Sequence, residues 1–199
     1  MSVRFADESE FGFGWIESER MQRTSHALVA DGRVWVIDPI DADGVDERIR
    51  ALGEPAGVIQ LLDRHDRDSG AYAARLGVPL HVVPVEIEEA PFEFRSVLRN
   101  RWWKEVALWW PERRVLVCAD VLGTVAFFRA GDERIGVHPF LRLRPPRSLR
   151  GLGVEHLLVG HGEGLHGDGT AAGVEETLRC ARGRIPRWLA GVPRIIRAG

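Results

Sequence analysis

The side chains best suited to chemistry gather in one short stretch, from Asp63 to Asp68. This stretch combines carboxylates, a histidine and arginines, the groups that bind metal ions or form charge-assisted ion pairs. It directly follows an apolar run, 57–62, that predicts a buried strand, and precedes a short predicted helix, 71–77, that ends in a glycine. Taken alone, such a stretch is more often a solvated loop. Its place at the carboxyl end of a strand, where α/β folds bind ligands, favours a functional site.

Two later segments repeat the arrangement of an apolar strand that ends in a polar residue. The run 115–119 leads into Asp120, and the run 156–160 leads into His161. Singly, Asp120 could be a helix cap and Gly160-His161-Gly162 a tight turn. With His65 they make three strand ends whose side chains could meet at one edge of a sheet.

In their order and spacing, these strand ends resemble the metallo-β-lactamase superfamily of metal-dependent hydrolases. The segment 25–39, with a turn at Asp31-Gly32 and an end at Asp38-Pro39, is similar to the opening hairpin of that family. The resemblance implies a four-layer αββα sandwich, in which two sheets are flanked by helices. We expect a single domain over residues 1–199.

The chain departs from the family at its signature loop, which is His-x-His-x-Asp-His. The ligand positions that the resemblance implies for two metal ions hold, in this chain, Asp63, His65, Arg67, Asp68, Arg101, Asp120 and His161. A guanidinium group is cationic at any ordinary pH and has no lone pair to offer. Arg67 and Arg101 therefore cannot be ligands, and each implied metal loses a donor.

We expect the arginines to replace the metals, with Arg–carboxylate pairs that neutralise Asp63, Asp68 and Asp120. On this hypothesis the protein is a divergent member of the fold with a degraded two-metal site, no cofactor and no conventional di-zinc hydrolysis. Arg67, Arg101 and Trp102 could then hold a small anionic ligand.

The alternative is an enzyme with one metal ion. His65, His161 and Asp120, with one of Asp63 and Asp68, could bind zinc, iron or manganese and leave a position for water. Such an enzyme would hydrolyse a small ester, thioester or amide, with Asp63, His65 and Asp120 as its catalytic residues. Of the other histidines, His138 could line the pocket and His166 could reach it, but their spacing does not mark either as a ligand.

Tryptophans are the second unusual feature. Trp102-Trp103 and Trp109-Trp110 bracket an alternating strand, so each pair sends one ring to either face of a sheet. These rings either pack in the core or form an aromatic wall beside Arg101, which would stack on an organic ligand or form a homodimer surface. Further patterns predict a helix near 45–52, strands between 92 and 117, a loop over the site at 123–146 and a helix at 170–182.

Composition narrows the function classes. The 199 residues are 45% hydrophobic, enough for a substantial core, and the formal net charge of −2 gives no general attraction to nucleic acid. Cys118 and Cys180 do not make a disulfide framework. No signal peptide or long apolar span is present, so we expect a cytoplasmic protein that does not bind membranes.

Overall fold

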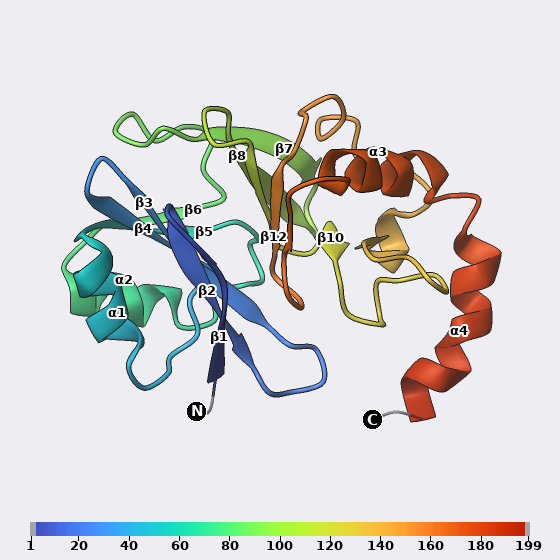
Figure 1. The fold of residues 1–199 in the computed structure, drawn as a ribbon, viewed down its shortest axis with the longest axis horizontal. Helices are drawn as coiled ribbons and strands as arrows, with labels where there is room; N and C mark the ends of the chain where they lie inside the picture. Colours follow the sequence, from blue (N-terminus) through green and yellow to red (C-terminus); the bar gives the residue numbers. More distant parts are fainter. Residues whose placement is uncertain (1–2, 198–199) are drawn as a thin grey trace.

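Two twisted sheets form the centre of the computed structural model, which describes residues 3–197 (Figure 1). The first sheet has six strands in chain order. They are β1 (Val3–Ser9), β2 (Gly12–Glu17), β3 (Thr24–Ala30), β4 (Arg33–Ile37), β5 (Glu54–Gln60) and β6 (Leu80–Val82). The first four run antiparallel, and β4, β5 and β6 are parallel.

The second sheet has five strands in the order β13-β12-β9-β8-β7. Their bounds are β7 (Glu93–Arg99), β8 (Lys104–Trp110), β9 (Val115–Cys118), β12 (His156–Val159) and β13 (Leu165–His166). The pair β9–β12 is parallel, so both strands deliver their carboxyl ends to the same edge. A separate small pair joins β10 (Leu122–Gly123) and β11 (Gly136–Val137), followed by a short 3-10 helix at Pro139–Leu141.

Helices cover the outer faces of the two sheets. In Figure 1, α1 (Val45–Leu52) and α2 (Ser69–Leu76) lie together on the side of the first sheet, and α3 (Thr170–Cys180) lies beside the second. The last helix, α4 (Ile185–Arg197), runs along the end of the molecule beyond α3. These layers confirm the expected αββα sandwich.

Apolar side chains from both sheets share one core. Leu28, Trp35 and Ile59 of the first sheet belong to the same buried cluster as Leu116 and Leu157 of the second. A smaller cluster packs the first sheet against its helices, with Val36 and Val58 facing Ile49 of α1 and Tyr72 of α2. In β5, Val58 packs into the smaller cluster and Ile59 into the larger one, so consecutive apolar residues are buried on opposite faces of the sheet.

The predicted opening hairpin is present, and its turn has a local cause. Ala30 pairs with Arg33 across a two-residue connection. Asp31 and Gly32 both have positive φ, 51° and 75°. A type I′ turn requires positive φ at both central residues, which Asp-Gly tolerates well. The second strand of this hairpin, β4, pairs parallel with β5. Asp38 therefore leaves β4 at the edge of the sheet where β5 also ends.

The two sheets are joined by short backbone bridges at that edge. Thr24 N–H donates to the carbonyl of Gly160 at 2.9 Å, and Gly162 N–H donates to that of Gln22 at 2.9 Å. On the other side, Asp63 N–H donates to the carbonyl of Lys104 at 3.0 Å. The strand ends that carry the polar side chains are therefore held at a fixed separation. Within residues 3–197, no helix is both long enough and apolar enough to cross a membrane.

Candidate metal site

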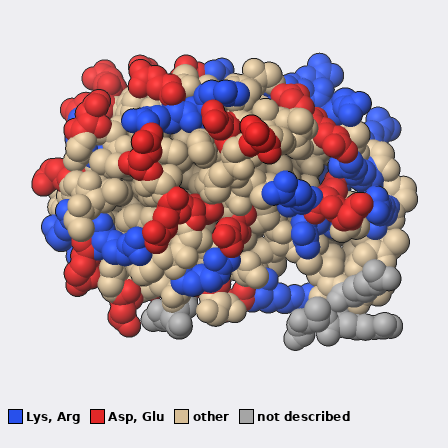
Figure 2. Space-filling model, in the orientation of Figure 1, with Lys and Arg blue, Asp and Glu red and all other residues tan. Residues whose placement is uncertain are grey.

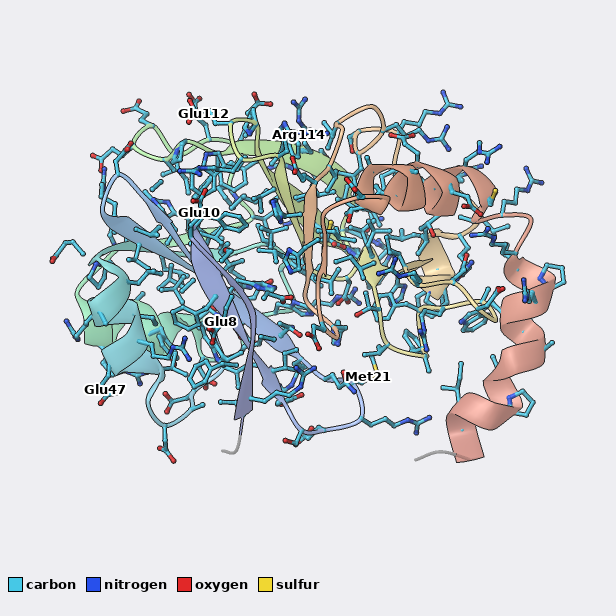
Figure 3. All side chains as sticks on the ribbon, in the orientation of Figure 1. Glu8, Glu10, Met21, Glu47, Glu112 and Arg114 are labelled. Atoms are coloured by element: carbon cyan, nitrogen blue, oxygen red, sulfur yellow. The ribbon has the colours of Figure 1, made fainter. Side chains whose placement is uncertain are left out.

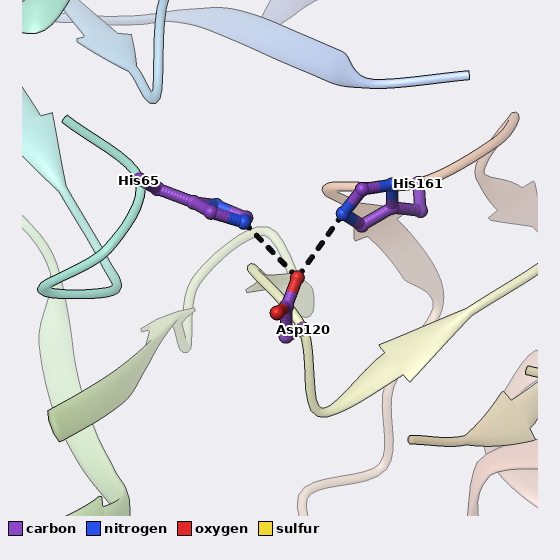
Figure 4. Close-up of side chains that lie close together, drawn as sticks. All are labelled: His65, Asp120 and His161. Carbon is purple, nitrogen blue, oxygen red and sulfur yellow. Dashed lines mark hydrogen bonds and ion pairs between the residues drawn. The ribbon is translucent and has the colours of Figure 1, made fainter. Parts of the chain in front are cut away.

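Three side chains predicted from separate strand ends meet at this edge. His65 Nε2 lies 3.0 Å from Asp120 Oδ1, and His161 Nε2 lies 3.1 Å from the same oxygen (Figure 4). Each residue offers one ligand atom, and these atoms all lie within 4.8 Å of one another. The arrangement supplies two imidazoles and one carboxylate, a donor set suited to zinc, iron or manganese.

Strand register accounts for the pairing of His161 with Asp120. In the parallel pair, Val159 lies opposite Cys118, so the next residues of the two strands leave the sheet side by side. Gly160 permits this approach, because a Cβ there would lie 2.6 Å from the carbonyl oxygen of Ala119. Gly162 has φ +93°, a left-handed conformation that turns the chain away after His161.

The outer nitrogen of each imidazole faces an acceptor. His161 Nδ1 lies 2.9 Å from the carbonyl oxygen of Met21, and His65 Nδ1 lies 3.4 Å from Asp38 Oδ2. Carbonyl and carboxylate oxygens only accept, so both Nδ1 atoms carry protons. The two Nε2 atoms and Asp120 Oδ1 then converge on a position that needs positive charge, supplied either by a second proton on each ring or by a metal ion. Metal-bound histidines usually have such an oriented outer nitrogen.

The contacts within the cluster shift the pKa values of His65 and Asp120 in opposite directions. Burial and Arg67 act to lower the pKa of His65, but its hydrogen bonds to Asp120 and Asp38 outweigh them, and the pKa is raised. Burial acts to raise the pKa of Asp120, yet the hydrogen bonds from His161 and His65 hold it well below its usual value. Asp120 is therefore an anion under all ordinary conditions.

Glu105 is a buried carboxylate that our sequence reasoning missed. Its Oε1 accepts hydrogen bonds from the backbone N–H groups of Asp120 at 2.9 Å and Val121 at 2.8 Å, and its Oε2 accepts from Trp103 Nε1 at 2.8 Å. Burial and the charge of Asp120 raise the pKa of Glu105 to about 7, against these hydrogen bonds. A single carboxylate inside the apolar run of β8 was the available signal. Through these hydrogen bonds, Glu105 positions the turn that carries Asp120.

Arg67 lies beside the cluster, but its partners differ from those expected. Its Nη1 donates to the carbonyls of Thr24 at 2.7 Å and Asp38 at 3.0 Å, and its Nη2 lies 3.2 Å from that of Gly160. Among the described residues it forms no salt bridge within 4.0 Å with Asp63, Asp68 or Asp120. Burial lowers the pKa of Arg67, opposed by the charges of Asp38 and Asp120. The guanidinium therefore ties backbone segments of both sheets together and places one positive charge near Asp120.

The other predicted carboxylates stand outside the three-residue cluster. Asp68 Oδ2 accepts the backbone N–H of Asp41 at 2.8 Å. Asp63 Oδ1 is buried, and no hydrogen-bond partner for it exists among residues 3–197. The structure thus brings His65, Asp120 and His161 together and leaves Asp63 and Asp68 at the periphery.

Arg101 and Trp102 lie at an exposed turn. The backbone N–H groups of Trp102 and Trp103 both donate to Asn100 Oδ1, and the Arg101 guanidinium stacks 4.1 Å from the centre of the Trp102 ring. Trp102 is 70% exposed, whereas Trp103 is buried. Within the described part of the chain, Arg101 has no hydrogen bond or ion pair with the cluster. The tryptophan that approaches the site is Trp103.

Aromatic rings line one side of the site through the segment after β10. The ring of His138 lies 4.9 Å from that of Trp103 and 5.6 Å from that of Phe128, centre to centre. Phe128 also lies 5.5 Å from the ring of His161. Burial lowers the pKa of His138 to about 4, so this imidazole is neutral at pH 7. The predicted loop over the site is thus a packed aromatic wall.

A cavity of about 790 Å³ lies next to this wall. Its lining is mostly apolar and comes from the β2–β3 connection, the segment after β10 and α4; it includes Met21, Val125, Phe127, Trp188 and Ile195. Met21 is the residue whose carbonyl faces His161, and Figure 3 shows it on the β2–β3 connection. Figure 2 shows that acidic and basic side chains are interspersed over this face of the molecule.

Comparisons with known proteins identify the fold. No protein-family model matches the sequence, and no curated protein is significantly similar to it. Solved structures do match. DIM-1 metallo-β-lactamase exposed to ceftazidime has 12% identity and a TM-score of 0.57, covering 94% of this chain and 97% of that one. TMB-1 has 12% identity and a TM-score of 0.55, with 94% and 98% covered. A metallo-β-lactamase from Erythrobacter litoralis has 8% identity and a TM-score of 0.57, with 92% of each chain covered. The chain has the metallo-β-lactamase fold.

Proposed function

We propose that this protein is a hydrolase of the metallo-β-lactamase fold that uses one divalent cation, held by His65, Asp120 and His161. Arg67 stands beside it in place of a second metal ion. One observation carries the proposal. Both imidazoles commit Nδ1 to an acceptor and turn Nε2 toward Asp120 Oδ1.

The donor geometry fits a cation. Zinc binds histidine nitrogen and carboxylate oxygen at about 2.0–2.2 Å, which places neighbouring ligand atoms roughly 3.3 Å apart in a tetrahedral site. The observed separations from Asp120 Oδ1 are 3.0 and 3.1 Å. Three protein ligands leave one position for water or substrate, as in catalytic rather than structural zinc sites.

The residues around the cluster have separable roles. When bound, the cation supplies Lewis-acid chemistry, in which it polarises a carbonyl and makes water more acidic. Glu105 holds the backbone of Asp120, and Asp38 and the Met21 carbonyl orient the two imidazoles. The aromatic wall excludes water from one side.

The neighbouring cavity favours a substrate with an apolar portion. Val125, Phe127 and Trp188 offer apolar surface, and Arg20 and Arg129 add positive charge to its lining. A small ester, thioester or amide with an apolar group and a nearby negative charge matches this chemistry.

A second candidate is a metal-free domain without hydrolytic activity. The raised pKa of His65 and the lowered pKa of Asp120 favour it, because a protonated His65 would neutralise the carboxylate without any metal. The site would then present positive charge from His65 and Arg67, which suits a small anionic ligand. Metal content separates the two candidates.

Elemental analysis of protein purified without chelator, and calorimetric titration with zinc, iron or manganese, test the proposal. We expect the metal held by this cluster to be lost in His161→Gln and retained in His81→Gln, a matched change on β6. Metal-dependent turnover of an ester and thioester panel should follow the same pattern. Absence of a His161-dependent metal after supplementation, together with no turnover, would establish the metal-free candidate instead.

A further inference from the structure

A second pair of histidines, His156 and His166, lies at the amino end of β12, away from the carboxyl end that leads to His161. His156 begins β12, His166 ends β13, and the two are cross-strand partners in the antiparallel register. Their Nδ1 atoms lie 3.1 Å apart, and the rings are tilted by 50° with centroids 5.3 Å apart. His156 also packs edge-on against Phe11, with ring centres 5.0 Å apart. Cross-strand partners on one face are held close by the sheet itself.

A buried carboxylate orients one of these rings. His166 Nε2 lies 3.1 Å from Asp7 Oδ1, which also accepts the backbone N–H of Gly164 at 2.9 Å. The Asp7 side chain is only 1% exposed. Because a carboxylate only accepts, the proton of His166 sits on Nε2, and its Nδ1 presents a lone pair to His156. This is the carboxylate–histidine arrangement that fixes the tautomer of metal-binding imidazoles.

We propose that His156 and His166 bind a divalent cation of the zinc class through their Nδ1 atoms, at a site separate from the His65–Asp120–His161 cluster. Two imidazole nitrogens on a tetrahedral zinc ion are roughly 3.3 Å apart. The observed 3.1 Å needs an adjustment of only a few tenths of an ångström. His166 is exposed, so water completes the coordination.

The same geometry describes the metal-free state. There, His156 Nδ1–H donates to the lone pair of His166 Nδ1. Binding requires His156 to adopt the tautomer with its proton on Nε2, and no net charge is lost from either ring. Nearby charges are mixed, since Arg114 lies 3.3 Å from Glu155 as an ion pair and Asp7 is the buried anion behind His166.

The position of Asp7 gives the site a structural consequence. Asp7 belongs to β1 of the first sheet, whereas His156 and His166 belong to the second. A cation on the two imidazoles therefore strengthens a chain of contacts that joins the sheets. Because a ligand that binds only the folded state stabilises it, zinc at this site raises the melting temperature.

Imidazole nitrogen NMR during a zinc titration tests the proposal on the intact protein. We expect the Nδ1 resonances of both His156 and His166 to shift together, independently of any change at Nε2 of His65 and His161. His156→Gln should abolish this response and reduce the zinc-dependent rise in melting temperature. Asp7→Asn, which keeps a residue tolerant of the positive φ of 52°, should weaken zinc binding by about 10–100-fold.

His81→Gln is the matched control and should bind zinc as the unaltered protein does. If Nδ1 of His156 and His166 stay unshifted while the protein is saturated with zinc, the proposal is wrong. It is equally wrong if His156→Gln and His166→Gln both retain the complete response. The two sites are distinguished if His156→Gln loses the Nδ1 response but keeps the Nε2 response of His65 and His161. The converse result for His161→Gln distinguishes them equally.

Discussion

Arg67 is the residue at which this chain departs furthest from a two-metal site, and its environment explains how the departure is tolerated. Its guanidinium donates to three backbone carbonyls, from Thr24, Asp38 and Gly160, that lie on both sheets. A planar guanidinium with donors in a fixed fork can satisfy several acceptors at once. The compact ammonium group of a lysine does not offer this geometry. The positive charge is thereby fixed near Asp120 without occupying the convergence point of the imidazoles.

Arg67→Ala should therefore destabilise the protein by about 3 kcal/mol, because buried carbonyls lose a charged donor. Arg64→Ala, in the same loop, should change the unfolding free energy by at most about 1 kcal/mol, since Arg64 is exposed and stacks on the Trp103 ring at 4.5 Å. Urea denaturation of both variants measures the difference. Equal stabilities would show that the three hydrogen bonds contribute nothing.

Residue types and strand ends were sufficient to predict that His65, Asp120 and His161 lie close together. The partners of Arg67 could not be predicted in the same way, because backbone carbonyls carry no mark in the sequence. Arg101 was harder still. An irregularity between Ser96 and Leu98 shifts the register of β7 against β8, and Asn100 then caps the turn that exposes Arg101. Counting residues back from β8 cannot predict the register shift in β7 or the turn capped by Asn100.

At the scale of elements, the segment from β10 to the 3-10 helix matters most to the site. The sequence predicted a loop of mixed character there, but not its packing. His138 lies among Trp103, Phe127 and Phe128, and its Nδ1 accepts the backbone N–H of Phe140 at 3.3 Å. This requires a neutral ring with its proton on Nε2. Aromatic contacts between residues distant in sequence decide this structure, and no local pattern encodes them.

The burial of His138 predicts a stability change with pH. Its folded pKa of about 4 lies below the ordinary value of 6.5, so the folded state binds fewer protons between these values. Its contribution is complete above pH 6.5 and is lost as pH falls to 4, by about 3 kcal/mol in total. His138→Gln should lose that part of the pH dependence, as measured by thermal unfolding between pH 7 and 4. A His138 ring that titrates near 6.5 by NMR would contradict this account.

At the scale of the whole molecule, the sandwich was predictable because the three strand ends and the opening hairpin occur in a recognisable order. Its cohesion was not evident from the sequence. One apolar cluster spans both sheets, and backbone bridges close the edge that holds the site. The fold therefore joins its two halves at the place where it holds His65 and His161, so loss of either half would dismantle the site.

This shared core predicts that residues 1–199 unfold as one domain. Differential scanning calorimetry should give a single transition whose calorimetric and van't Hoff enthalpies agree. Leu116→Ala, at a fully buried position of β9, should cost about 3–4 kcal/mol and lower the melting temperature by about 10 °C, while Val85→Ala, which is 69% exposed, should shift it by only about 1–2 °C. Because Leu116 packs in the cluster that also holds Leu28 and Ile59, the whole transition should move. Two transitions, of which Leu116→Ala moves only one, would mean that the sheets fold independently.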